Sequence, residues 1–104
     1  MKLREERFEG GSRHLWAELR DDGSLVIEGQ DLGKGTEIVS GDGEYEWTHT
    51  FEPEHVPALL GLLGGQAGEA ADTVLARYVG EASYELERRI RACAIPYSRF
   101  TWSG

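Results

Sequence analysis

The stretch HLWAELRDDGSLVIE, residues 14–28, decides the fold of this chain. Apolar residues alternate with polar ones from His14 to Arg20, which is the period of a half-buried strand. The cluster Asp21-Asp22-Gly23-Ser24 follows, and glycine supplies the positive φ that tight turns require. Leu25 to Glu28 then continues in strand-forming residues. The segment is therefore predicted to be a β-hairpin.

A second alternating segment runs from Tyr45 to Phe51, with Tyr45, Trp47, His49 and Phe51 on one side and Glu44, Glu46, Thr48 and Thr50 on the other. The aromatic side indicates a strand that packs against a helix layer. We expect His49 to be partly buried and hydrogen-bonded on that side. Tyr97 to Trp102 is also aromatic and follows Pro96, which predicts a final strand.

Between these strands the period changes to that of helices. We predict helices from Glu54 to Leu63, ended by Gly64-Gly65, from Glu69 to Val79, and from Ser83 to Cys93 with Ser83 as N-cap. Glu87 and Arg91 stand four apart, a spacing typical of a surface ion pair. Cys93 is expected to pack in the core rather than to react.

The order of strands, helices and a last strand favours the α+β class over a doubly wound fold. We predict an antiparallel sheet of about four strands with two or three helices on one face. Residues 1–104 are expected to form one domain, in which residues 1–12 are a charged, glycine-rich and flexible lead-in where Phe8 could add a short strand or a plug. Gly29 to Gly43 is expected to be a long polar connection that could hold a short edge strand at Thr36–Val39.

The charge balance narrows the class of partner. Eleven Lys and Arg against nineteen Asp and Glu give a net charge of −8. This sign argues against nucleic acid and anionic membranes and permits a basic protein partner. One cysteine and no apolar N-terminal segment favour a reducing, cytoplasmic location.

The sequence contains no complete motif for catalysis, phosphate binding or metal binding, so no catalytic, cofactor-binding or metal residue is predicted. Gly29 to Thr36 is one residue short of a phosphate-binding loop, and no helix pattern follows it. The three histidines lack metal-ligand spacing, and the carboxylates do not match a calcium-binding loop.

The remaining candidates are residues that could contact a partner. Trp16 lies opposite the apolar face of its strand, where an exposed ring would act as a binding anchor. The carboxylates between residues 28 and 46 are either a solvated acidic face or a surface for Arg and Lys of a partner. The predicted partner-binding residues are Trp16, Glu28, Asp31, Glu37, Asp42, Glu44 and Glu46.

Three motifs carry a resemblance: LVIEGQDLG at 25–33, EYEW at 44–47 and IPY at 95–97. With them the chain resembles a family of small acidic bacterial proteins, frequent in actinobacteria, whose function is uncharacterised. The resemblance spans about residues 13 to 102 and implies no active-site residue. In size and charge the chain is also similar to immunity proteins of bacterial toxin systems.

Three functions follow as hypotheses. The first is a non-enzymatic protein-binding module, like an immunity protein or antitoxin, that presents an acidic loop and sheet face to a basic partner. The alternative is a small-ligand-binding or regulatory domain with a pocket between the aromatic strand face and the helices. An enzyme using carboxylates and a histidine is the least favoured. A homodimer through the open sheet face would also cover Trp16. The first hypothesis expects the core beneath the aromatic strand to be filled by side chains.

Overall fold

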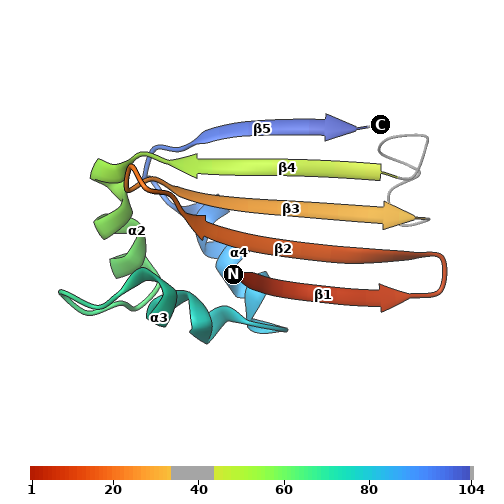
Figure 1. The fold of residues 1–104 in the computed structure, drawn as a ribbon, viewed down its shortest axis with the longest axis horizontal. Coiled ribbons are helices and arrows are strands. Elements are labelled where there is room, and N and C mark those ends of the chain that lie inside the picture. The colour runs from red at the N-terminus through yellow and green to blue at the C-terminus, as the bar shows by residue number, and fades with distance from the viewer. Residues whose placement is uncertain (34–43, 104) are drawn as a thin grey trace.

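The structure is a computed structural model that describes residues 1–33 and 44–103. Its centre is one antiparallel sheet of five strands that lie in chain order (Figure 1). The fold is α+β, as the sequence predicts. The strands are β1 (Lys2–Phe8), β2 (Gly11–Leu19), β3 (Leu25–Gly33), β4 (Glu44–Phe51) and β5 (Ser98–Ser103).

The predicted hairpin is confirmed as β2 and β3, which pair from Gly11↔Gly33 to Leu19↔Leu25. Gly23 adopts a φ of 91° in the turn, and the Asp22 carboxylate accepts hydrogen bonds from the backbone and hydroxyl of Ser24. A side chain at Gly23 would be strained, since only glycine adopts this φ at little cost.

The N-terminal residues are not a lead-in, because residues 2–8 form β1 and pair with β2. The register shifts between Lys2 and Arg4, and both Leu3 and Arg4 are buried. A bulge of this kind interrupts the alternation of buried and exposed positions. The charged sequence of β1 therefore does not show the period that marks β2 and β4.

The strand β3 extends to Gly33, so the predicted connection from Gly29 is wrong over its first five residues. Gly29 serves the sheet rather than a loop: a Cβ there would lie 2.1 Å from Cζ2 of Trp47. The indole ring of Trp47 thus lies flat over the backbone of β3. The predicted strand at Thr36–Val39 falls outside the described residues.

The first two helices are shorter than predicted, whereas the third has the predicted length and begins one residue earlier. A 3₁₀ turn, η2 (Pro53–His55), leads into α2 (Val56–Leu62); α3 (Ala71–Leu75) continues as a 3₁₀ turn, η3 (Ala76–Tyr78); and α4 (Ala82–Ala92) follows. Ser83 is not the N-cap of α4. It lies within the first turn, fully buried, where its hydroxyl donates to the Gly80 carbonyl.

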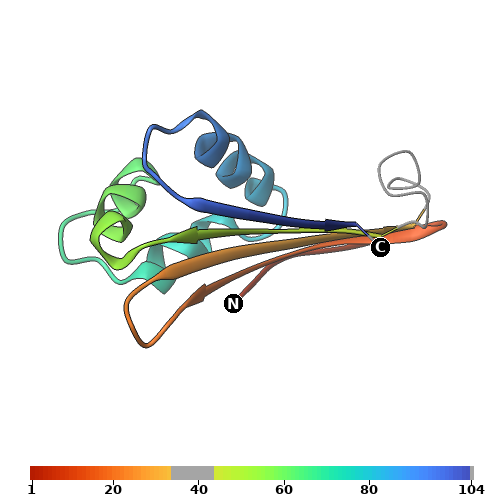
Figure 2. The ribbon, with the colours of Figure 1, turned by 90° about the horizontal axis from the view of Figure 1, so that it is seen from above.

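The helices cover only the part of the sheet near the β2–β3 turn, and the strands extend beyond them (Figures 1 and 2). The core lies between the helices and the sheet, and both contribute side chains to it. Its residues are Leu3, Leu15, Ala17, Leu25, Ile27, Phe51, Val56, Leu59, Leu63, Val74, Leu75, Tyr78, Leu86 and Ile90. Cys93 lies just after α4, half-buried and outside this core.

The pairing register defines the two faces of the sheet. Residues directly opposite each other on neighbouring strands share a face. The helix face contains Leu15, Ala17 and Ile27 from the core, and the open face contains Trp16 and its partner Glu28.

Candidate functional site

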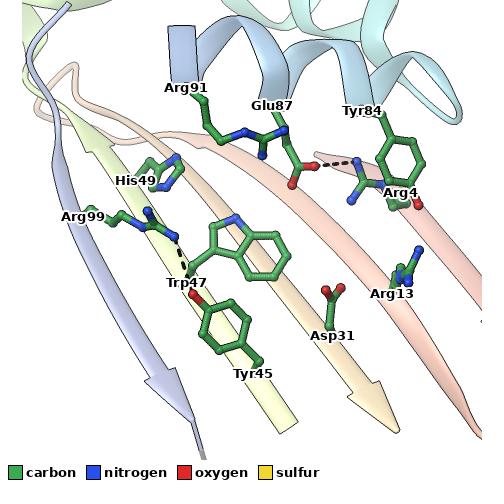
Figure 3. A pocket seen from close by; sticks show the side chains of 10 residues that line it. All are labelled: Arg4, Arg13, Asp31, Tyr45, Trp47, His49, Tyr84, Glu87, Arg91 and Arg99. Atoms are coloured by element: carbon green, nitrogen blue, oxygen red, sulfur yellow. Dashed lines mark hydrogen bonds and ion pairs between the residues drawn. The ribbon is translucent and has the colours of Figure 1, made fainter. Parts of the chain in front are cut away.

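A cavity of about 240 Å³ lies between α4 and the helix face of the sheet, where the strands emerge from the core (Figure 3). The sequence predicted that side chains fill the space between the aromatic side of β4 and the helices. The cavity shows that this prediction is wrong for one part of β4. Phe51 is in the core, whereas Tyr45 and Trp47 line the cavity. Its lining residues are Arg4, Arg13, Asp31, Tyr45, Trp47, His49, Tyr84, Glu87, Arg91 and Arg99.

Aromatic rings from β4 form the floor of the cavity. The ring centroids of Tyr45 and Trp47 lie 5.7 Å apart at an interplanar angle of 29°. Trp47 is held low over the sheet because Gly29 has no side chain to displace it. A flat apolar floor of this kind favours ring stacking by a ligand.

Arg4 and Glu87 form a structural pair at the end of the cavity near β1. The guanidinium Nη2 of Arg4 lies 3.1 Å from Oε2 of Glu87, and Nε donates to the Ser83 hydroxyl over 2.8 Å. The two charged side chains are only 2% and 12% exposed. Arg4 also stacks 3.6 Å from the centroid of the Tyr84 ring. The charge of Arg4 is thus committed to joining β1 to α4.

Arg91 and Arg99 approach the cavity from α4 and β5, on the side where β5 joins the sheet (Figure 3). Arg99 donates to the Tyr45 hydroxyl at 3.5 Å, a long and weak hydrogen bond. Neither arginine has a carboxylate within ion-pair distance in residues 1–33 and 44–103. Their charges therefore remain open to a ligand.

The i,i+4 pair predicted between Glu87 and Arg91 is wrong. Glu87 turns to Arg4 instead, and the observed i,i+4 pair on α4 joins Glu85 to Arg89 at 2.9 Å. The reason is tertiary, since Arg4 enters from the far end of the chain and takes the carboxylate.

His49 is buried beside Arg99, its cross-strand partner on β5, and its ring lies 4.8 Å from that of Tyr97. Burial first, and then the positive charges of Arg99 and Arg91, lower the pKa of His49 to about 4. The imidazole is therefore neutral at pH 7. Its Nε2 atom is buried without a hydrogen-bond partner among the described residues, contrary to the expected hydrogen bonding.

Asp31 stands on the other side of Trp47, on β3. Its Oδ1 atom is buried and finds no hydrogen-bond donor in the described part of the chain. Burial raises the pKa of Asp31, and the nearby Arg13 guanidinium partly offsets this effect. The cavity thus offers an unsatisfied acceptor on this side.

The residues predicted to bind a partner are divided between the faces. The open face contains Trp16 and Glu28, which pair across β2 and β3. It also contains Glu46, which pairs with Gln30 across β3 and β4. Asp31 lies on the helix face, in the cavity. Glu44 pairs with Leu32 through its backbone, and its side chain lies outside what the structure describes. Glu37 and Asp42 are likewise outside the described residues.

Sequence reasoning missed the four arginines of the cavity. The aromatic side of β4 was a usable signal, because it showed where a ring-lined surface would be. The arginines gave no such signal in the sequence, because they lie on β1, β2, α4 and β5 and come together only in the folded chain.

The described residues show no group of three or more His, Cys, Asp or Glu side chains that could hold a metal ion. No helix in the described ranges is long and apolar enough to cross a bilayer. Comparison of the chain with protein-family models, curated proteins and solved structures finds no match.

Proposed function

We propose that this protein binds a small anionic ligand in the cavity between α4 and the helix face of the sheet. The observation that carries the proposal is the pair Arg91 and Arg99, which line an aromatic-floored cavity without a carboxylate partner in the described residues. Guanidinium groups bind carboxylates and phosphates through paired hydrogen bonds.

The charge distribution supports the proposal. The chain as a whole carries −8, yet the cavity is lined by four arginines against Asp31 and Glu87. The lowered pKa of His49 has the same origin in part, since Arg99 and Arg91 disfavour a further positive charge there. A positive cavity in a negative molecule attracts an anion locally.

The size of the cavity supports a small ligand. Its volume of about 240 Å³ lies just below the roughly 300–1,000 Å³ of pockets for drug-sized molecules. A molecule with one ring and an acidic group would fill such a space.

Isothermal titration with benzoate and phenyl phosphate tests the proposal. Each of Arg91→Gln and Arg99→Gln should weaken the binding of the better probe by about tenfold or more, since a hydrogen bond to a charged group contributes roughly 1.5–3 kcal/mol. Arg88→Gln is the matched control, because Arg88 lies on the same helix, is 73% exposed and pairs with Glu85. Absence of binding by the wild-type protein, or equal weakening by the control, would refute the proposal.

A second candidate function is binding of a basic protein on the open sheet face. Phe100 and Trp102 are 66% and 45% exposed there. Each ring ends a row of cross-strand neighbours on this face. Phe100 ends the row that begins at Trp16 and passes through Glu28, and Trp102 ends the row that contains Glu46. Exposed rings beside carboxylates suit a partner with Lys or Arg side chains.

A further inference from the structure

The register of β3 and β4 sets the order of the chemical groups along the cavity. The pairs Asp31↔Tyr45, Gly29↔Trp47 and Ile27↔His49 follow one another at intervals of two residues. Since a strand rises about 3.3 Å per residue, Asp31 and His49 stand about 13 Å apart along the strands, with Trp47 midway. They are too far apart to act on one proton, so they mark two ends of an elongated site.

The two ends differ in what they need from a ligand. Asp31 presents a buried carboxylate oxygen without a donor in the described part of the chain. Arg91 and Arg99, on the other side of Trp47, need an acceptor with negative charge (Figure 3). A site with a buried acceptor rejects analogues that lack the matching N–H or O–H, because the acceptor is then left unpaired.

From this order we infer the class of the ligand: a single-ring aromatic acid with an N–H or O–H donor on the side of the ring opposite its acidic group. The ring stacks on Trp47, the donor meets Asp31, and the acidic group meets Arg91 and Arg99. The inference rests on the proposed function. Beyond an anionic group, it specifies an aromatic ring, a hydrogen-bond donor and the orientation of the ligand in the cavity.

The environment of Asp31 agrees with this orientation. Burial raises the pKa of the carboxyl group, so its ionised form is poorly stabilised when the cavity holds no ligand. A ligand donor would restore the missing hydrogen bond. The Arg13 guanidinium lies opposite Asp31 across β2 and β3 and offsets only part of the effect of burial on the pKa of Asp31, so an acidic group at this end would still face a poorly compensated carboxylate.

The test compares ligands with and without the donor by isothermal titration at pH 7. The pairs are benzoate with 4-aminobenzoate or 4-hydroxybenzoate, and phenyl phosphate with 4-aminophenyl phosphate, which separates a carboxylate from a phosphate as the acidic group. In at least one series we expect the para donor to strengthen binding by tenfold or more. In Asp31→Ala, which removes the acceptor, the advantage should fall below about threefold, while the parent acid still binds.

The parent acid reports on folding and on the proposed function separately. Asp72→Ala is the matched control, because Asp72 is exposed on α3 away from the cavity, and it should keep the full advantage of the donor. If the parent acids bind and the para donor gives no advantage in either series, the inference is overturned and the proposed function stands. If none of the acids binds, the proposed function itself fails. An advantage that survives in Asp31→Ala would also overturn the inference.

Discussion

His49 carries a neutral imidazole at pH 7 because burial and two guanidinium groups both disfavour the imidazolium. This state matters for the cavity, since a protonated His49 would add a third open positive charge beside Arg91 and Arg99. The arginines alone therefore set the charge available to an anion at this end.

The pKa of His49 predicts how stability depends on pH. Below the ordinary value of 6.5 the unfolded chain takes up a proton that the folded protein refuses until about pH 4. The free energy of unfolding should therefore fall as pH drops from 6.5 to 4, by up to about 1.4 kcal/mol per pH unit from this residue.

Urea unfolding of the wild type and of His49→Gln across pH 4–8 measures this contribution. The difference between the two proteins should change with pH below 6.5 and stay constant above it. A difference between wild type and His49→Gln that does not vary with pH would contradict the assignment.

At the scale of elements, the contact between β1 and α4 closes the end of the cavity. It depends on Arg4, which lies at the bulge of β1 and reaches Ser83 and Glu87 on α4. A buried ion pair adds little beyond an apolar replacement, but loss of one partner leaves an uncompensated charge.

Arg4→Met should therefore lower the free energy of unfolding by about 3–5 kcal/mol, and Arg4→Met with Glu87→Met should recover part of that loss. Urea denaturation of both variants, with Glu87→Met alone to complete the cycle, gives the coupling. Lys2→Met removes an exposed pair with Glu5 in the same strand and should leave the free energy of unfolding nearly unchanged. Equal effects of Arg4→Met and Lys2→Met would show that the contact is not structural.

At the scale of the molecule, the sheet separates two surfaces of different chemistry. The helix face beyond the core has a cationic, ring-lined cavity, and the open face has the exposed rings of Phe100 and Trp102, the second of which lies opposite Glu46. A small anion and a basic partner could therefore bind on opposite faces without competing for residues.

Nuclear magnetic resonance titration with a synthetic peptide of alternating lysine and leucine tests the second candidate function. Amide shifts should gather at the open face, near Trp16, Glu28 and Glu46, and Phe100→Ser with Trp102→Ser should weaken binding about tenfold, as expected for two interface aromatics. Arg91→Gln should leave peptide binding unchanged. Shifts confined to the cavity, or none at all, would speak against this surface.

The sequence by itself determined the hairpin, the aromatic strand β4, the class of fold and the negative total charge. These features follow from local period and composition, which act over a few neighbouring residues. The predicted Ser83 cap failed because a buried contact with Arg4 governs that position. Likewise, β1 was not predicted, because its bulge breaks the alternation of apolar and polar residues on which strand prediction depends.

Only the tertiary structure decided where the positive charge gathers. Arg4, Arg13, Arg91 and Arg99 lie on four elements, and nothing in their spacing along the chain indicates a common site. The sheet brings β1, β2 and β5 into one surface, and α4 closes over it. The sign of the charge around a cavity depends on distances through space, so a chain of net −8 can present a site for an anion.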